Sequence, residues 1–271
     1  MTGRGWLRRA AVVLTAATLA AGCEVRAGDG DFSFEFAAGK AADTWTRSYE
    51  LAPGGRIEII NVNGQIHAEA TTGTKVEVAA ERSASASSDD DARRLLDAVE
   101  MREEIGDRRV RIETVAPKLR LGGHKVTYRV RVPAGVHVDL RTVNGGVRLD
   151  NVGGEVRASS TNGGVKGTLS GASLIDARTT NGGVELTVTG VLAVDGDVRL
   201  SSVNGGVRLA VPAATRAALS ARCVNGRVTV NDLDLSAEGE QTRRRVAGTI
   251  NGGGARIDLQ TTNGGVTIGR S

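Results

Sequence analysis

Aliphatic and polar residues alternate along most of this chain, and the alternation ends repeatedly at an Asn-Gly pair. Residues 138–147, V-D-L-R-T-V-N-G-G-V, give the clearest example. Counted from the Asn, the sixth and fourth residues before it are mostly aliphatic or Ala, the second before it is mostly Ser or Thr, and the third after it is mostly Val or Ile. Alternate residues of a strand point to one side of a sheet, so these positions share a buried face. The repeat occurs at Asn63, Asn144, Asn162, Asn181, Asn204, Asn225, Asn251 and Asn263.

Two all-β architectures fit this repeat. In a β-solenoid resembling a parallel β-helix, each repeat is one coil, and equivalent residues lie about 4.8 Å apart in successive coils. In an antiparallel hairpin ladder, each Asn-Gly is the tip of a turn, where Gly supplies a positive φ. The asparagines from Asn144 to Asn225 are 18, 19, 23 and 21 residues apart, which is enough for two or three short strands with turns.

The solenoid also explains why the same residue types recur. Stacked Asn side chains, and stacked Ser or Thr side chains, would hydrogen-bond to their own kind one coil away. We therefore predict a β-solenoid of short strands. The hairpin ladder stays open around Asn251, where spacings of 26 and then 12 residues depart from one coil per repeat.

The N-terminal residues predict export. Residues 1–22 hold Arg4, Arg8 and Arg9, then an apolar run over residues 10–21 that is too short to span a bilayer as a helix. The small residues before Cys23, with Leu19 four residues ahead of it, resemble a bacterial lipobox. The resemblance implies cleavage before Cys23 and acylation of Cys23. Ordinary signal cleavage that releases a soluble protein is the alternative.

The rest of the chain divides into a tether and one repeat domain. Residues 23–44 are rich in Gly, Asp and Ala and predict a tether, although Phe32, Phe34 and Phe36 could form a short edge strand. Strand patterning fills residues 45–271, and the regular repeats start at about residue 136. A helix is predicted over about residues 88–105, because Ser88 is a good N-cap, three acids follow it, and Gly106 can end the helix.

Composition agrees with a thin repeat fold and argues against nucleic-acid binding. Aromatic residues make up 3% of the 271 residues, which suits coils filled by Val, Leu, Ile and Ala. The formal net charge is +4, but residues 1–22 carry three Arg and no acid, so the mature charge would be +1. The high isoelectric point therefore comes largely from the signal segment.

No motif in the sequence predicts catalysis, a metal or a cofactor. His67, His124 and His137 have no His partner at metal-ligand spacing, and neither a nucleophile elbow nor a P-loop is present. Cys223 stands in the Ser/Thr column of the repeat, so we interpret it as a packed replacement for a hydroxyl residue.

Cations recur at two outward positions of the repeat. Stacked coils would line them into basic stripes that could contact phosphate or carboxylate groups of lipid headgroups or wall polymers. We favour a mixed, solvated face over such a binding stripe, because Glu185 interrupts one stripe and several acids lie close by. The candidate contacts are Arg148, Lys166 and Arg208, four residues after the Asn, and Arg141, Arg178 and Arg222, three before it.

The order of motifs resembles the bacterial putative-adhesin family of β-strand-repeat envelope proteins. The likeness covers roughly residues 45–271 and consists of a strand pair over residues 55–66, a helix insertion, a strand ending in V-P-x-G at residues 132–135, and the repeated N-G-G-V. It implies a β-strand-repeat fold at the cell envelope, and the family has no active-site residues to carry over.

We therefore expect a non-enzymatic, lipid-anchored protein on the cell envelope, either periplasmic or at the outer surface. Its repeat surface would serve adhesion or another contact with an envelope polymer or protein. A polysaccharide-active β-helix enzyme and an envelope-stress signalling component are the alternatives. The sequence does not fix the oligomeric state.

Overall fold

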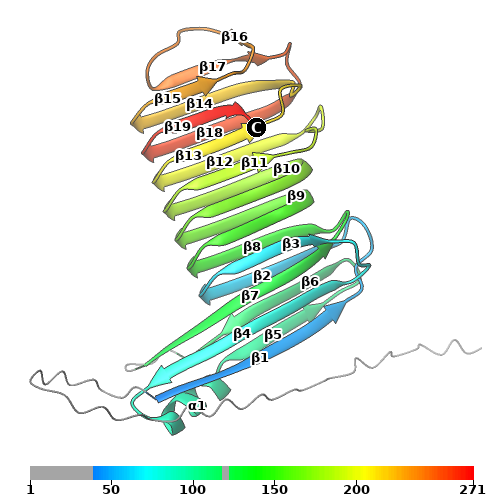
Figure 1. The fold of residues 1–271 in the computed structure, drawn as a ribbon, viewed down its shortest axis with the longest axis vertical. Helices are drawn as coiled ribbons and strands as arrows, with labels where there is room; N and C mark the ends of the chain where they lie inside the picture. Colours follow the sequence, from blue (N-terminus) through cyan, green and yellow to red (C-terminus); the bar gives the residue numbers. More distant parts are fainter. Residues whose placement is uncertain (1–38, 118–121) are drawn as a thin grey trace, which may run out of the picture.

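The computed structural model describes residues 39–117 and 122–271 (Figure 1). The predicted signal peptide, Cys23 and most of the predicted tether lie outside the described residues. The described part consists of strands and the turns and loops that connect them, with one short helix. The prediction of an all-β fold is confirmed.

The strands follow one another along the chain with mostly short connections. Their bounds are β1 (Gly39–Tyr49), β2 (Arg56–Asn63), β3 (Ile66–Thr71), β4 (Val76–Ala86), β5 (Glu100–Ile105), β6 (Arg109–Val115), β7 (Gly123–Pro133), β8 (His137–Asn144), β9 (Val147–Asn162), β10 (Val165–Asn181), β11 (Val184–Val188), β12 (Asp197–Asn204), β13 (Val207–Val211), β14 (Ala217–Asn225), β15 (Val228–Asn231), β16 (Leu235–Ala237), β17 (Arg245–Ile250), β18 (Ala255–Asn263) and β19 (Val266–Arg270). The helix α1 (Asp89–Asp97) lies between β4 and β5.

Each repeat makes one flattened coil of two strands that meet at the Asn-Gly corner. The strand before the corner lies in what we call the first sheet, in the order β5-β6-β2-β8-β9-β10-β12-β18-β14-β17-β16. The strand after it lies in the second sheet, in the order β1-β4-β7-β3-β9-β10-β11-β13-β19-β15. The long strands β9 and β10 belong to both sheets, because each passes from the second sheet to the first at the edge opposite the Asn-Gly corners.

Equivalent residues of successive coils are in register. In the first sheet Asn144 aligns with Asn162, and Asn162 with Asn181. Pairing between the repeat coils is parallel, so the solenoid prediction is confirmed and the hairpin ladder is wrong for these coils. A parallel stack gives every inner strand two neighbours, which leaves unpaired backbone only at its two ends.

The coils do not stack in sequence order. The last coil, formed by β18 and β19, lies between the coil of β12 and β13 and the coil of β14 and β15. After β15 the chain forms β16 and β17. β17 covers β14 by antiparallel pairing, β16 pairs with the outer side of β17, and the chain then returns into this slot. This return explains the short interval between Asn251 and Asn263.

Antiparallel strands close the N-terminal end of the stack. β1 pairs with β4, β4 with β7, and β5 with β6 (Figure 1). Two predicted boundaries are corrected here. Residues 39–44, expected in the tether, belong to β1. The helix begins after Ser88 as predicted but ends at Asp97, and residues 100–105 form the edge strand β5.

The core is a thin layer of aliphatic side chains between the two sheets. It is continuous from Ile57 to Ile268, and the aliphatic columns of the repeat are almost fully buried within it. The second residue before the Asn is also buried at Thr142, Ser160, Thr179, Ser202 and Thr261. Cys223 occupies the same column and is 7% exposed, which agrees with its interpretation as a packed residue.

Candidate interaction surface

The Asn-Gly corners form a ladder of side-chain amides along one edge of the stack. Each Asn Nδ2 donates to the Asn Oδ1 of the neighbouring coil over 2.7–2.9 Å. All donations run toward the N-terminal end, where Asn63 Nδ2 lies 3.4 Å from His124 Nε2. In spatial order the ladder contains Asn63, Asn144, Asn162, Asn181, Asn204, Asn263 and Asn225.

Asn251 does not belong to this ladder. Its backbone has a φ of 49°, and its Nδ2 donates to the carbonyl oxygens of Ala213 and Thr215 over 2.9 and 2.8 Å. Asn251 lies in the turn between β17 and β18, so its Asn-Gly pair fixes the return of the chain and not a coil corner. Its inclusion in the predicted turn ladder is wrong.

The buried hydroxyl column bonds to backbone and not to its own kind. Ser160 Oγ donates to the carbonyl oxygen of Gly145 over 2.7 Å, and Thr179 Oγ1 donates to that of Gly163 over 2.6 Å. Thr142, Ser202 and Thr261 make the equivalent bond to a corner glycine. The column therefore satisfies a carbonyl group of the neighbouring coil, which is the reason for a hydroxyl at this otherwise apolar position.

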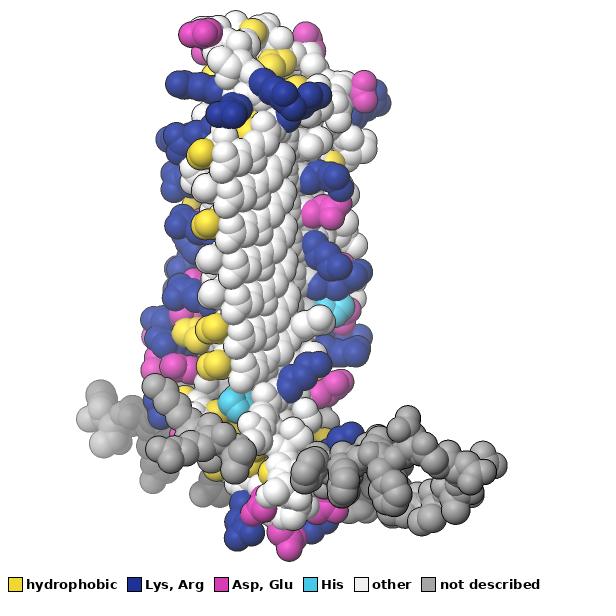
Figure 2. All heavy atoms as spheres, turned by 90° about the vertical axis from the view of Figure 1, so that its left-hand side faces the viewer, with side chains coloured by type: hydrophobic (Ala, Val, Ile, Leu, Met, Phe, Trp, Pro, Cys, Tyr) yellow, Lys and Arg dark blue, Asp and Glu magenta, His cyan; other side chains and the backbone are white. Residues whose placement is uncertain are grey.

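An uncharged strip runs along the ladder edge, with charged side chains on both sides of it (Figure 2). The strip consists of the Asn-Gly corners, and the exposed residue before the Asn is Val or Thr in each coil of the ladder. The six predicted cations lie on the two flanks: Arg141, Arg178 and Arg222 project from the first sheet, and Arg148, Lys166 and Arg208 project from the second. The structure thus brings them into two columns and not into one site.

At one position of the first sheet, charges alternate in sign over five successive coils, although Glu58 in the coil before them has the same sign as its partner Asp139. The fifth residue before the Asn is Asp139, Arg157, Asp176, Arg199 and Asp258 in successive coils, each in register with the next. Opposite charges on neighbouring strands attract, and like charges would repel. This face is therefore an alternating pattern and not a continuous basic stripe.

Arginines of the first sheet are also paired along their own strands. Arg141 Nε and Nη2 donate to Asp139 over 2.9 and 2.7 Å, and Arg178 donates to both Asp176 oxygens over 2.6 Å. These hydrogen bonds raise the pKa of the Arg141 and Arg178 guanidinium groups. Between them, over Ser159, lies an open hollow of about 240 Å³. Its walls carry both signs of charge, so it does not select an anion.

Most charges of the second sheet are paired as well. Arg148 Nε donates to Asp150 over 3.0 Å, and His67 Nε2 lies 2.6 Å from the same carboxylate. The hydrogen bond from Arg148, and to a smaller extent that from His67, lowers the pKa of Asp150. Arg208 pairs with Glu185 over 2.9 Å. Of the three predicted cations on this sheet, Lys166 makes no ion pair with a described residue.

The sequence indicated acids close to the candidate cations, but it was not used to predict which acid pairs with which arginine. Asp139, Glu155, Asp176 and Asp197 each stand two residues before the arginine that they pair with. Because residues i and i+2 of a strand share a face, the D-x-R and E-x-R spacing already contained this signal. It indicates that an outward Arg in this repeat is neutralised when an acid stands two residues before it.

The described residues contain no cluster that suggests catalysis or metal binding. Within residues 39–117 and 122–271, no group of three or more His, Cys, Asp or Glu could hold a metal ion. His67 and His137 bond to neighbouring coils, and His124 lies at the end of the ladder. No helix in this part of the chain is long and apolar enough to cross a membrane.

These features define a class of protein: a two-sheet β-solenoid with a registered amide ladder and largely neutralised outer faces. The chain belongs to the Toastrack family (DUF4097), a domain of unknown function, whose profile matches residues 14–269. No curated protein matches the sequence.

Solved structures are similar to this chain at low sequence identity, and the first of them shares its fold. A putative cell adhesion protein from Clostridium sporogenes is 11% identical, with a TM-score of 0.52, and the alignment covers 85% of this chain and 100% of that one. A putative adhesin from Bacteroides fragilis is 13% identical, with a TM-score of 0.37, over 84% of this chain and 97% of that one. A putative lipid binding protein from Parabacteroides distasonis is 8% identical, with a TM-score of 0.26, over 84% and 97%.

Proposed function

We propose that this protein is a non-enzymatic, lipid-anchored component of the cell envelope that presents the solenoid as an interaction surface. Acylated Cys23 holds the chain at a membrane, and residues 24–38 connect the anchor to β1. The ligand is an envelope polymer or protein that meets the outer faces or the far end of the stack.

The shape of the stack is the observation that carries this proposal. Seven coils in register, about 4.8 Å apart, give a rod of about 30 Å beyond the antiparallel end where the chain enters. Such a rod holds its far end away from an N-terminal anchor. The name of the Clostridium sporogenes protein, a putative cell adhesion protein, agrees with a surface role.

Metabolic labelling with an alkyne fatty acid tests the anchor. We expect the native protein to be labelled and to sediment with membranes, and Cys23→Ser to lose both properties. Cys223→Ser is the matched control, because Cys223 is buried in the core and should not affect acylation. Equal labelling of the native protein and Cys23→Ser would refute lipid anchoring at this residue.

A further inference from the structure

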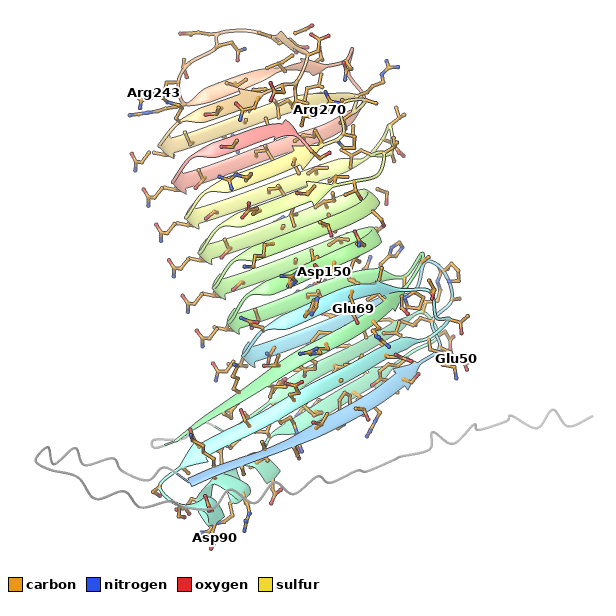
Figure 3. The ribbon with its side chains drawn as sticks, in the orientation of Figure 1. Glu50, Glu69, Asp90, Asp150, Arg243 and Arg270 are labelled. Carbon is orange, nitrogen blue, oxygen red and sulfur yellow. The ribbon has the colours of Figure 1, made fainter. Side chains whose placement is uncertain are left out.

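Five arginines gather at the end of the stack farthest from β1. Arg222 lies on β14, and Arg227 follows the corner of Asn225. Arg243 and Arg244 form the turn that enters β17, and Arg245 is the first residue of β17. We call these five residues the C-terminal arginine cluster. Figure 3 shows Arg243 at the ladder edge, and Figure 2 shows cationic side chains gathered at the end of the uncharged strip.

Backbone hydrogen bonds hold the cluster together. The carbonyl oxygen of Arg243 accepts from the amide of Val228, and that of Arg244 accepts from the amide of Cys223, both over 2.9 Å. Arg222 and Arg245 are direct partners in the antiparallel pair of β14 and β17. The turn is therefore held beside the corner of the terminal coil, which brings the backbones of the five arginines together at this end of the stack.

None of the five arginines forms an ion pair with a residue that the structure describes. Several outward arginines of the repeat coils have a carboxylate, as in Arg141 with Asp139, Arg178 with Asp176 and Arg208 with Glu185. The exposed Arg256 on β18 and Arg270 on β19 also make no ion pair with a described residue, but they do not belong to a group of five. In the cluster, Arg222 contacts the neutral Oε1 of Gln260, over 3.2 and 2.7 Å. Glu238 and Glu240 are close in sequence but make no ion pair with it among the described residues.

This arrangement carries an electrostatic cost. Like charges directly opposite each other on neighbouring strands are destabilising, as at Arg222 and Arg245. Arg227 stands where the coils of Asn144, Asn162, Asn181, Asn204 and Asn263 have a second Gly, so its charge is absent from the equivalent corners. Unneutralised, clustered arginines create a positive potential that attracts a polyanion.

We propose that the C-terminal arginine cluster binds a linear, phosphate-bearing polymer of the cell envelope. Arg guanidinium groups match phosphate oxygens in a bidentate geometry, and five of them around an exposed corner suit a chain of repeated anions better than a single enclosed ion. The proposal deepens the proposed function and rests on it for the placement of the cluster: an N-terminal anchor directs this end away from the membrane, which favours a polymer over lipid headgroups.

Binding of inorganic polyphosphate to the purified full chain tests the proposal. The Cys23→Ser background removes any acyl chain, so a failure of anchoring does not affect the result. We compare R227S/R243S/R244S with R148S/R178S/R208S, which removes the same charge from arginines that are already paired. Side chains of the first set make no hydrogen bond to a described residue, and unfolding temperature checks that both variants fold.

We expect the cluster variant to weaken polyphosphate binding about tenfold or more. The slope of log Kd against the logarithm of the salt concentration should fall by about 2 to 3, since up to three phosphate contacts are lost. The control should weaken it by less than about threefold. Equal loss in the two variants would show that net charge alone attracts the polymer and would overturn the proposal. So would tighter binding of polygalacturonate, duplex DNA or phosphatidylglycerol vesicles than of polyphosphate at equal anion concentration.

Discussion

The first glycine of each corner is required by the closeness of successive coils. A Cβ added to Gly145, Gly163, Gly182, Gly205 or Gly264 would lie 2.0–2.3 Å from a glycine carbonyl oxygen of the neighbouring coil. The same carbonyl accepts the buried Ser or Thr hydroxyl, as Gly182 does from Ser202. The same carbonyl oxygen therefore explains two recurring positions within the repeat: it leaves no room for a Cβ at the first glycine, and it accepts a hydrogen bond from the Ser or Thr.

Neighbouring glycines provide a matched test of this contact. A Cβ on Gly205 would lie 2.0 Å from the Gly182 carbonyl oxygen, whereas one on Gly206 would lie 3.4 Å from that of Gly265. Gly205→Ala should lower the free energy of unfolding by more than about 2 kcal/mol, and Gly206→Ala by less than about 1 kcal/mol. Urea denaturation measures both. Similar stabilities of the two variants would contradict the packing account of the corner.

The His124 side chain makes the end of the amide ladder sensitive to pH. Asn63 Nδ2 can donate to His124 Nε2 only when the imidazole is neutral at that nitrogen. Burial lowers the pKa of His124, so the folded protein binds this proton more weakly than the unfolded chain. Neutral His124 therefore contributes its full share to the stability of the folded protein above about pH 6.5, and this contribution is lost as the pH falls through the pKa of His124 in the folded state.

His124→Gln isolates this effect, because a Gln amide can accept from Asn63 and does not titrate. As the pH falls from 8 to 5, the native protein should lose more unfolding free energy than His124→Gln does. Urea titrations at several pH values measure it. A difference that is constant with pH would show that His124 does not titrate differently in the folded state.

At the scale of elements, the sequence predicted strands better than it predicted their partners. Local pattern fixed the start of α1, where Ser88 Oγ accepts from the Asp91 amide over 3.1 Å. It did not fix the end. Residues 100–105, E-M-R-E-E-I, are mostly good helix formers, yet they pair along their whole length with β6. Pairing between distant strands outweighed local preference, and no local pattern reports such pairing.

The first strand was missed for a related reason. Residues 39–44 are small or polar, so their composition resembles a tether, and they are strand because β1 pairs with β4 over its full length. For the candidate cations, the sequence predicted their positions but not their ion pairs. Their columns followed from the repeat, but which were neutralised depended on acids two residues earlier and on neighbouring coils.

At the scale of the whole molecule, coil order is the property that the repeat cannot encode. Every coil presents the same aliphatic, hydroxyl and Asn columns, so any order of stacking satisfies the pattern. The order observed, with β18 between β12 and β14, depends on β16 and β17 covering the terminal coil and returning the chain. It also places the C-terminal strand β19 between two neighbours, which protects an otherwise exposed edge.

A cysteine cross-link tests this registered stack most directly. Cys223 aligns with Thr261, while Ser202 aligns with Thr261 from the other side and is two coils from Cys223. Adjacent coils are about 4.8 Å apart, within the Cα separation that a disulfide spans, and two coils are about 9.6 Å apart, which is too far.

The measurement is disulfide formation under oxidative refolding in a Cys23→Ser background, with thiol alkylation and mass spectrometry as the readout. The account predicts that Thr261→Cys forms a disulfide with Cys223 and that Ser202→Cys does not. A disulfide between Cys223 and Ser202→Cys, with Thr261→Cys left reduced, would mean that the coils stack in sequence order and would contradict the fold described above.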